Sequence, residues 1–154
     1  MTPTVRPAPT VRPATDADLD DVVRLFTGYL AFYGRTHTAD DVRAFLAARQ
    51  RDGDAVLLVA DVAGAVVGFA QCYPTWSSLS LARAWVLNDL FVDAAARGSG
   101  AGRALVRGVL AAARTAGAVH VSLETAATNR TAQALYVAEG FTRDEEFWAY
   151  ATGV

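Results

Sequence analysis

The stretch RGSGAGR, residues 97–103, separates an apolar run from Trp85 to Val92 and a helical pattern from Ala104 to Ala116. Glycine tolerates positive φ and leaves backbone N–H groups unobstructed, and a helix start adds the positive end of its dipole. We therefore expect an anion, such as the phosphate of a ligand, to bind at this turn. The residues expected to bind it are Arg97, Gly98, Ser99, Gly100, Ala101, Gly102 and Arg103.

The spacing of the glycines distinguishes three phosphate-binding loops. The nucleotide P-loop needs GxxxxGK followed by Ser or Thr, and the chain has no such string. The dinucleotide fingerprint GxGxxG is weakened because Arg103 stands where its third glycine belongs. The third pattern has Arg or Gln at its first position, Gly at its fourth and Gly or Ala at its sixth. Arg97, Gly100 and Gly102 satisfy it. A glycine-rich connection that binds no ligand is the simplest alternative.

A second pattern occurs in NRTAQALYVAEGF, residues 129–141. Asn129 and Tyr136 lie about two helical turns apart, so they can share one face of a helix that Gly140 ends. By position alone, Asn129 suits a helix N-cap and Tyr136 suits an amphipathic core contact.

Together the two patterns resemble the signatures of the GNAT superfamily of N-acetyltransferases, over roughly Val11 to Tyr150. The resemblance implies that the glycine-rich turn binds the pyrophosphate of acetyl-CoA. It also implies that Asn129 contacts the pantetheine arm and that the Tyr136 hydroxyl faces the CoA sulfur. In such a fold the pantetheine enters where two parallel strands splay apart, and it pairs there with the main chain of Leu90, Phe91 and Val92.

Periodicity, turn residues and capping boxes predict the order of helices and strands. The expected helices run from Thr15 to Tyr33, Thr38 to Arg51, Ala104 to Ala116 and Asn129 to Glu139. The expected strands run from Thr10 to Pro13, Ala55 to Asp61, Val66 to Tyr73, Trp85 to Val92, Ala118 to Glu124, Phe141 to Arg143 and Glu146 to Ala151. With the resemblance, this order predicts an α+β fold of three layers (α/β/α) around a mixed, mainly antiparallel sheet with a splayed parallel pair of strands.

The short turn from Val62 to Ala65 predicts an antiparallel hairpin. Consecutive parallel strands need a crossover instead, so the hairpin argues against a dinucleotide-binding oxidoreductase. At 154 residues the chain suits one domain, which we expect at residues 10–154 behind a flexible tail of residues 1–9.

Acetyl transfer to an amine needs a group that accepts a proton, because an alkylammonium has a reference pKa of roughly 10.4. A chain of water molecules could serve, or one of the carboxylates Asp89, Glu124, Glu145 and Glu146. Asp89 is the first candidate because it precedes the expected cofactor-pairing residues, and Glu124 is its main rival because it ends the next strand. Asp89 could instead be turned away and hydrogen-bonded to the sheet edge. Tyr136 would then donate a proton to the departing thiolate, while main-chain N–H groups steady the oxyanion. Transfer is direct and needs no acyl-enzyme.

Residues 73–92 resemble the polyamine branch, which includes spermidine/spermine acetyltransferases, and the yeast histone acetyltransferase-like enzymes. That resemblance implies an amine acceptor. An aromatic and acidic rim would favour a cation, and its candidates are Tyr33, Tyr73, Trp76 and Asp89. The same aromatic residues also suit ordinary core or dimer contacts. A non-catalytic acyl-CoA sensor would keep the same cofactor residues, so it remains a second candidate function.

Composition excludes several partners. A net charge of -2 lacks the basic footprint of a nucleic-acid binder. A single cysteine, Cys72, excludes an internal disulfide and suits a buried thiol, and the Cys and His spacing of a zinc site is missing.

Without a membrane-spanning or secretory segment, we expect a cytoplasmic protein. The aromatic residues Phe147, Trp148 and Tyr150 near the chain end predict a homodimer.

Overall fold

The computed structural model describes residues 7–154, which divide into two compact units, one ending at Glu124 and one beginning at Thr125. Residues 1–6 of the expected tail lie outside this range. The elements of the first unit are β1 (Thr10–Pro13), η1 (Asp16–Asp18), α1 (Leu19–Phe32), α2 (Ala39–Asp52), β2 (Val56–Val62), β3 (Ala65–Ser77), β4 (Ala82–Val92), η2 (Ala94–Ala96), α3 (Ala101–Thr115) and β5 (Ala118–Ser122).

The five strands of this unit form one sheet in the order β1-β2-β3-β4-β5. Three neighbouring pairs are antiparallel, and β4 and β5 run parallel. The expected mixed, mainly antiparallel sheet is therefore confirmed. The hairpin between β2 and β3 is also confirmed, and its two turn residues, Ala63 and Gly64, both have positive φ (54° and 86°). Such a turn matches the twist of the flanking strands.

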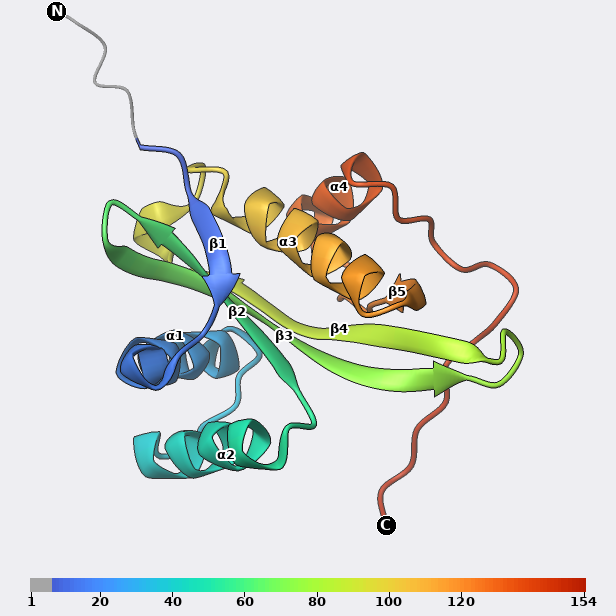
Figure 1. Cartoon of the computed structure of the whole chain (residues 1–154), viewed down its shortest axis with the longest axis horizontal. Helices are drawn as coiled ribbons and strands as arrows, with labels where there is room; N and C mark the ends of the chain where they lie inside the picture. Colours follow the sequence, from blue (N-terminus) through green and yellow to red (C-terminus); the bar gives the residue numbers. More distant parts are fainter. Residues whose placement is uncertain (1–6) are drawn as a thin grey trace, which may run out of the picture. The chain divides into compact units, whose positions relative to one another are not determined.

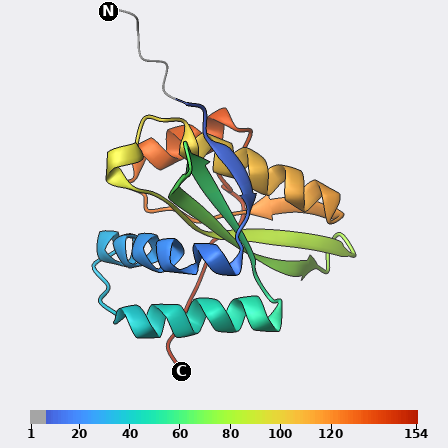
Figure 2. The same ribbon diagram turned by 60° about the vertical axis from the view of Figure 1, so that its left-hand side comes forward.

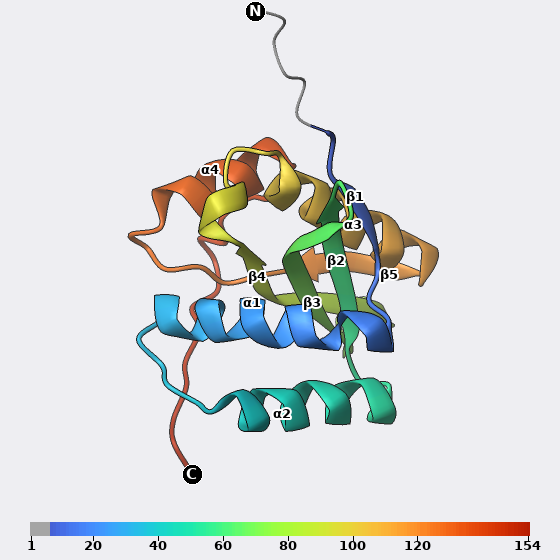
Figure 3. The same ribbon diagram turned by 90° about the vertical axis from the view of Figure 1, so that its left-hand side faces the viewer.

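Helices cover both faces of the sheet (Figure 1). α1 lies against one face, hereafter the α1 face, and α2 lies beyond α1 (Figure 3). α3 covers the opposite α3 face. The core on the α1 face includes Val22, Leu25, Phe26, Val42, Leu46, Val59 and Phe69. The core on the α3 face includes Leu58, Ala70, Cys72, Trp85, Leu87, Leu105 and Val109. No helix among residues 7–154 has the length and apolarity needed to cross a membrane.

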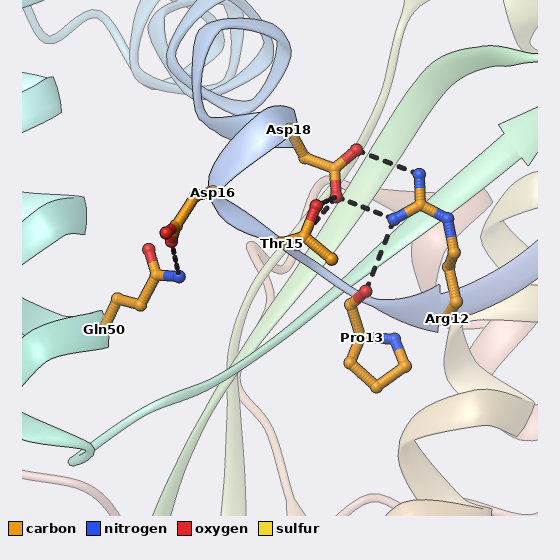
Figure 4. A network of polar contacts seen from close by, with 6 residues as sticks. All are labelled: Arg12, Pro13, Thr15, Asp16, Asp18 and Gln50. Atoms are coloured by element: carbon orange, nitrogen blue, oxygen red, sulfur yellow. Dashed lines mark hydrogen bonds and ion pairs between the residues drawn. The ribbon is translucent and has the colours of Figure 1, made fainter.

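Asp18 fixes the entry into α1 (Figure 4). The Arg12 guanidinium donates to both carboxylate oxygens at 2.7 and 2.9 Å, and the Thr15 N–H and hydroxyl donate to Oδ2 at 2.7 and 3.1 Å. The bond from Arg12, followed by those from Thr15, holds the pKa of Asp18 well below its usual value. The predicted capping box is thus formed, although it opens η1 rather than α1 itself, and Thr38 with Asp41 forms the second box at α2.

β3 and β4 are longer than the sequence pattern indicated. The strand expected to end at Tyr73 continues to Ser77, and its partner begins at Ala82 rather than Trp85. This part of the hairpin extends past the end of the β2 pairing, as Figure 2 shows. Pro74 hid the extension because proline lacks the N–H that a central strand uses. It is tolerated here because β2 pairs with β3 only as far as Cys72.

The second unit contains α4 (Arg130–Ala138), so the expected helix is confirmed. The Asn129 side-chain oxygen accepts the Ala132 N–H at 3.2 Å and caps the first turn. Gly140, with a φ of 94°, ends the helix, and the Phe141 N–H donates to the Tyr136 carbonyl at 3.0 Å. This is the C-terminal capping geometry that a glycine makes possible.

The two closing strands, expected at Phe141 to Arg143 and Glu146 to Ala151, are not formed, and that prediction is wrong. Asp144 explains part of the difference, because its Oδ1 accepts the N–H groups of Glu146 and Phe147 at 2.8 and 2.9 Å. A turn of this kind engages backbone donors that a strand would offer to its neighbour. The segment is irregular, and its side chains Phe147, Trp148 and Tyr150 are exposed.

Candidate active site

β5 pairs with only part of β4. The paired residues are Arg83 with Ala118, Trp85 with Val121 and Val86 with Ser122. From Leu87 to Val92, β4 pairs on its β3 side alone. The two parallel strands therefore part after Val86, and one edge of β4 is left open.

A β-bulge lies where the strands part. Gln71 faces Asp89, but the next residue of β3, Cys72, faces Leu87, so Asn88 is an extra residue in β4. A bulge bends its strand and increases the local twist, which accounts for the separation from β5. It also changes which way the side chains point. Leu87 packs on the α3 face, whereas Asp89 joins Gln71 on the α1 face.

The open edge of β4 presents main-chain groups at alternate residues. The Asp93 N–H donates to the Val67 carbonyl of β3 at 2.8 Å. Because the direction alternates along an antiparallel strand, the main chain of Phe91 also points to β3. The N–H and C=O groups of Leu90 and Val92 point to the other edge, where β5 has separated. Two of the three residues expected to pair with a ligand are therefore oriented toward this edge.

After β4 and the short η2, the glycine-rich turn leads into α3. Gly98 and Gly100 have φ values of 79° and 88°, which glycine adopts without strain. The helix begins at Ala101, earlier than the expected Ala104, so Gly102 and Arg103 belong to its first turn. Gly100 is the N-cap and has no side chain to satisfy the first N–H groups of the helix. The Ser99 hydroxyl accepts one of them, from Ala101, at 3.3 Å.

Arg97 of this turn and Arg24 of α1 contact residues that precede the turn in the chain. The Arg97 guanidinium lies over the Phe91 ring, 6.0 Å from its centroid. Arg24 donates to Asp93 at 2.9 Å, and Asp93 also accepts the Ala95 N–H at 3.2 Å. The bonds from Ala95 and Arg24 lower the pKa of Asp93. The carboxylate at the N-cap of η2 is thus paired with an arginine.

Asp89 is buried on the α1 face with two amide donors. Gln71 Nε2 donates to its Oδ2 and Asn88 Nδ2 donates to its Oδ1, both at 3.1 Å. Gln71 Nε2 also donates to the Tyr73 hydroxyl at 3.1 Å. Asp89 is 5% exposed and Gln71 is 1% exposed, whereas Asn88 is exposed, so one buried and one exposed neutral amide fix the orientation of the carboxylate. Sequence analysis did not select Gln71, although its alternation with Phe69 and Tyr73 placed it on the same face as them.

Two neighbours of this cluster have perturbed pKa values. Burial, followed by the nearby charge of Asp89, raises the pKa of the Cys72 thiol to about 12. The same two causes raise the pKa of Tyr73. Cys72 is therefore a protonated core thiol at neutral pH, as expected, and Tyr73 keeps its hydroxyl proton.

The expected acceptor rim is only partly assembled. Tyr73 and Asp89 are linked through Gln71, and Tyr33 lies at the end of α1 with its ring 5.1 Å from that of Tyr29. Trp76 is different, because it lies an odd number of positions from Tyr73 in β3 and so points to the α3 face. There its ring contacts the guanidinium of Arg83 at 4.6 Å.

The remaining site candidates are Glu124 at the end of the first unit and two residues of the second unit. Glu124 is exposed, two residues beyond the end of β5. In the second unit, Asn129 caps α4 and Tyr136 lies in that helix, with its ring 5.8 Å from that of Phe141. The cap expected of Asn129 is thus confirmed, whereas Tyr136 is half-buried and contacts the Phe141 ring.

Comparison with known proteins identifies the family. The model of the acetyltransferase (GNAT) family matches residues 20–141. An uncharacterized N-acetyltransferase of Bacillus subtilis, YhfO, is 38% identical over 94% of this chain and 97% of its own length. An uncharacterized N-acetyltransferase of Methanocaldococcus jannaschii is 32% identical, over 88% of this chain and 62% of its own length. The chain belongs to the GNAT family of acetyltransferases.

Solved structures agree with this assignment. The crystal structure of a probable acetyltransferase superimposes with a TM-score of 0.88 at 35% identity, covering 94% of this chain and 97% of that one. An aminoglycoside acetyltransferase from a soil metagenome has the same fold, with a TM-score of 0.76 over 95% of this chain and 96% of that one. Its identity is 15%, so it supports the fold alone.

Proposed function

We propose that this acetyltransferase moves the acetyl group of acetyl-CoA directly to a primary amine of a small molecule or peptide. One observation carries the proposal. The edge of β4 opens after Val86 and continues into a glycine turn at the start of α3. Main-chain groups for an extended amide-containing ligand, at Leu90 and Val92, and an anion site for its phosphates, at the start of α3, therefore follow each other along the chain.

Acetyl-CoA would bind along this path. Its pyrophosphate would accept hydrogen bonds from the first-turn N–H groups of α3, with Arg97 and Arg103 supplying charge. Its pantetheine amides would pair with Leu90 and Val92 at the open edge. The resemblance assigns a pantetheine contact to Asn129. Its side-chain oxygen already caps α4, which leaves its amide group as the donor for that contact.

The chemistry would use the buried carboxylate of Asp89 as the base. The acceptor reaches the site as an ammonium ion and gives one proton to Asp89, and its nitrogen then attacks the thioester carbonyl. The new N–C bond forms as the C–S bond breaks, and the Tyr136 hydroxyl protonates the thiolate. The nitrogen loses its second proton as the amide forms, and this proton restores the Tyr136 hydroxyl through water, while Asp89 returns its proton to solvent. Gln71 and Asn88 orient the Asp89 carboxylate. Glu124 is the alternative base, and its exposure suits a role reached through water.

A panel of amines tests the proposed function. Polyamines, arylalkylamines, amino acids, aminoglycosides and peptides are each incubated with the protein and acetyl-CoA, and released CoA is measured with a thiol reagent. At least one class should give release that depends on both the amine and the protein. Calorimetry run in parallel reports acetyl-CoA binding. If acetyl-CoA binds but none of the amines leads to CoA release, the result would support the non-catalytic sensor instead.

We also propose a homodimer formed through the chain end. Phe147, Trp148 and Tyr150 are 67%, 80% and 87% exposed, and such a cluster of aromatic side chains is typical of an interface. Light scattering should give twice the chain mass, and a truncation after Asp144 should give monomers. A full-length chain that stays monomeric at high micromolar concentration would contradict this proposal.

A further inference from the structure

α1 contacts the part of β4 that β5 leaves open. Phe91 packs its ring against the core on the α1 face, and Asp93, the first residue after β4, accepts a hydrogen bond from α1. Leu90 and Val92 flank Phe91, and their main-chain groups point to the open edge. This segment has a strand neighbour on one side only, so its contacts with α1 also determine where its main chain lies.

Gly28 lies in the interior of α1, where glycine is less favourable than alanine. Its φ is not positive, so the backbone conformation does not require a glycine. The Phe91 ring gives the reason for one. A Cβ at residue 28 would lie 3.1 Å from Cζ and 3.2 Å from Cε1 of this ring, closer than the usual carbon–carbon contact of about 3.5–4.0 Å. The absence of a side chain at Gly28 therefore lets the ring lie directly against α1.

Arg24 lies one turn before Gly28, on the same side of α1. Its Nη1 donates to Asp93 Oδ2 at 2.9 Å. Its Nη2 donates to the Val66 carbonyl at 3.2 Å and to Asp21 Oδ1 at 3.5 Å. The guanidinium thus joins β3 to the residue that follows β4. The side chains of Arg24 and Asp93 are 52% and 37% exposed, so their ion pair adds little to stability and mainly determines the position of Asp93.

Both contacts extend to the glycine-rich turn. Asp93 is the N-cap of η2, the short helix that leads to the turn, and it accepts the Ala95 N–H at 3.2 Å. The ring of Phe91 lies under the Arg97 guanidinium, 6.0 Å from its centroid. A shift of Phe91 would therefore move both the main chain at the open edge and an arginine of the turn.

We propose that Gly28 and Arg24 are positioning residues for acetyl-CoA, on which they act through Phe91 and Asp93. Gly28 sets the depth at which the Phe91 ring packs, and Arg24 holds the end of β4 against β3. The inference rests on the proposed binding of acetyl-CoA at the open edge of β4. It adds to that site two residues of α1 that neither sequence pattern indicated.

A double-variant cycle tests Gly28. Gly28→Ala, Phe91→Leu and the double variant are compared with the wild type by calorimetry with acetyl-CoA and by thermal melting. Gly28→Ala should weaken acetyl-CoA binding by about fivefold, because the added methyl displaces the ring and the main chain beside it. Its melting temperature should change little, because the helix propensity of alanine offsets the strain of the displaced ring. In the Phe91→Leu background the same exchange should change the Kd by less than about twofold, because leucine leaves room for the methyl.

Arg24 has a matched control on α2. Arg24→Met removes the bonds to Asp93 and Val66 and should weaken acetyl-CoA binding by about threefold. Arg24→Lys keeps one charged donor and should restore the Kd to within about twofold of the wild-type value. Arg43→Met breaks an exposed ion pair between α2 and Asp20 of α1, and it should leave the Kd unchanged.

The outcomes separate this inference from the function on which it rests, and each residue is judged by its own comparison. A wild type that binds no acetyl-CoA would overturn the proposed function, and with it this inference. Wild-type binding that Gly28→Ala and Arg24→Met leave unchanged would overturn the inference alone. Equal weakening by Gly28→Ala with phenylalanine or leucine at residue 91 would also overturn it, as would equal weakening by Arg24→Met and Arg43→Met, because the loss would then come from the general packing of α1. If Gly28→Ala does not fold by circular dichroism, the Arg24 comparison decides.

Discussion

Gln71 Nε2 lies 3.1 Å from Asp89 Oδ2 and donates a hydrogen bond to it across the antiparallel pair of β3 and β4. The bond exists because the bulge at Asn88 turns Asp89 to the α1 face. Both side chains are buried, so an unpaired donor or acceptor here would cost about 1–3 kcal/mol. The pair therefore orients the carboxylate that we propose as the base.

Gln71→Leu should lower kcat by about tenfold while leaving acetyl-CoA affinity unchanged, because a misplaced base slows transfer without touching the cofactor. Tyr73→Phe is the matched control. It removes the hydroxyl that accepts the second bond of Gln71 but leaves the bond to Asp89 intact. A tenfold loss in both variants would assign the effect to packing.

Asp89→Asn and Glu124→Gln should differ in the pH dependence of turnover. Each removes one ionisable group at nearly constant size, and the variant of the true base should lose the acidic limb of the profile. We expect that loss in Asp89→Asn and a wild-type profile in Glu124→Gln. Steady-state rates measured across the pH range with one amine provide the comparison. The reverse assignment would make Glu124 the base, and two unchanged profiles would point to deprotonation by water.

Gly100→Asp should weaken acetyl-CoA binding by roughly tenfold, a loss on the order of 1 kcal/mol or more. The substitution puts a negative charge at the N-cap of α3, where we place the pyrophosphate. Gly100→Asn is the matched control, because it imposes the same strained φ of 88° and nearly the same shape without the charge. Calorimetry of both variants isolates the electrostatic part. Equal affinities for the two would show that no phosphate sits at this turn.

Asp18→Asn should lower the free energy of unfolding by about 1–2 kcal/mol at neutral pH. The loss is modest because Arg12 is partly exposed, and solvent weakens its ion pair with Asp18. The pKa of Asp18 is lowered on folding, so its contribution is full above the unfolded value of roughly 4 and declines as the pH falls below it. Thermal melting at pH 7 and pH 3 measures this dependence. The stability gap between wild type and variant should narrow at pH 3, and a constant gap would contradict the assigned cause.

The sequence predicted most of the sheet order because strands and helices of this chain carry local signals. The capping residues Thr15 and Thr38 and the turn at Gly64 each determine their own element without help from distant residues. The parting of β4 and β5 was known only from the resemblance. No local pattern marks Asn88 as a bulge, since a bulge is a property of two paired strands.

Failures of the sequence analysis have the same origin. The aromatic residues after Phe141 suggested strands, yet a strand needs a partner, and the side chain of Asp144 engages the backbone instead. Trp76 was grouped with Tyr73 by composition, although an odd spacing sends the two side chains to opposite faces. A pocket between α1 and α2, lined by residues that include Phe26, Leu30 and Val42, depends on how these two helices pack. The periodicity within either helix does not reveal that packing.

Single-turnover stoichiometry tests direct acetyl transfer most plainly. Protein in excess over acetyl-CoA is mixed with the best amine of the panel, and CoA, acetylated amine and protein mass are followed together. The chain has no lysine, so a gain in protein mass would not come from stray acetylation of lysine side chains. We predict equal amounts of CoA and acetylated amine, and intact acetyl-CoA when the amine is omitted. Direct transfer would be contradicted by acetylated protein that forms before the acetylated amine. It would also be contradicted by CoA release at a rate that does not depend on the amine.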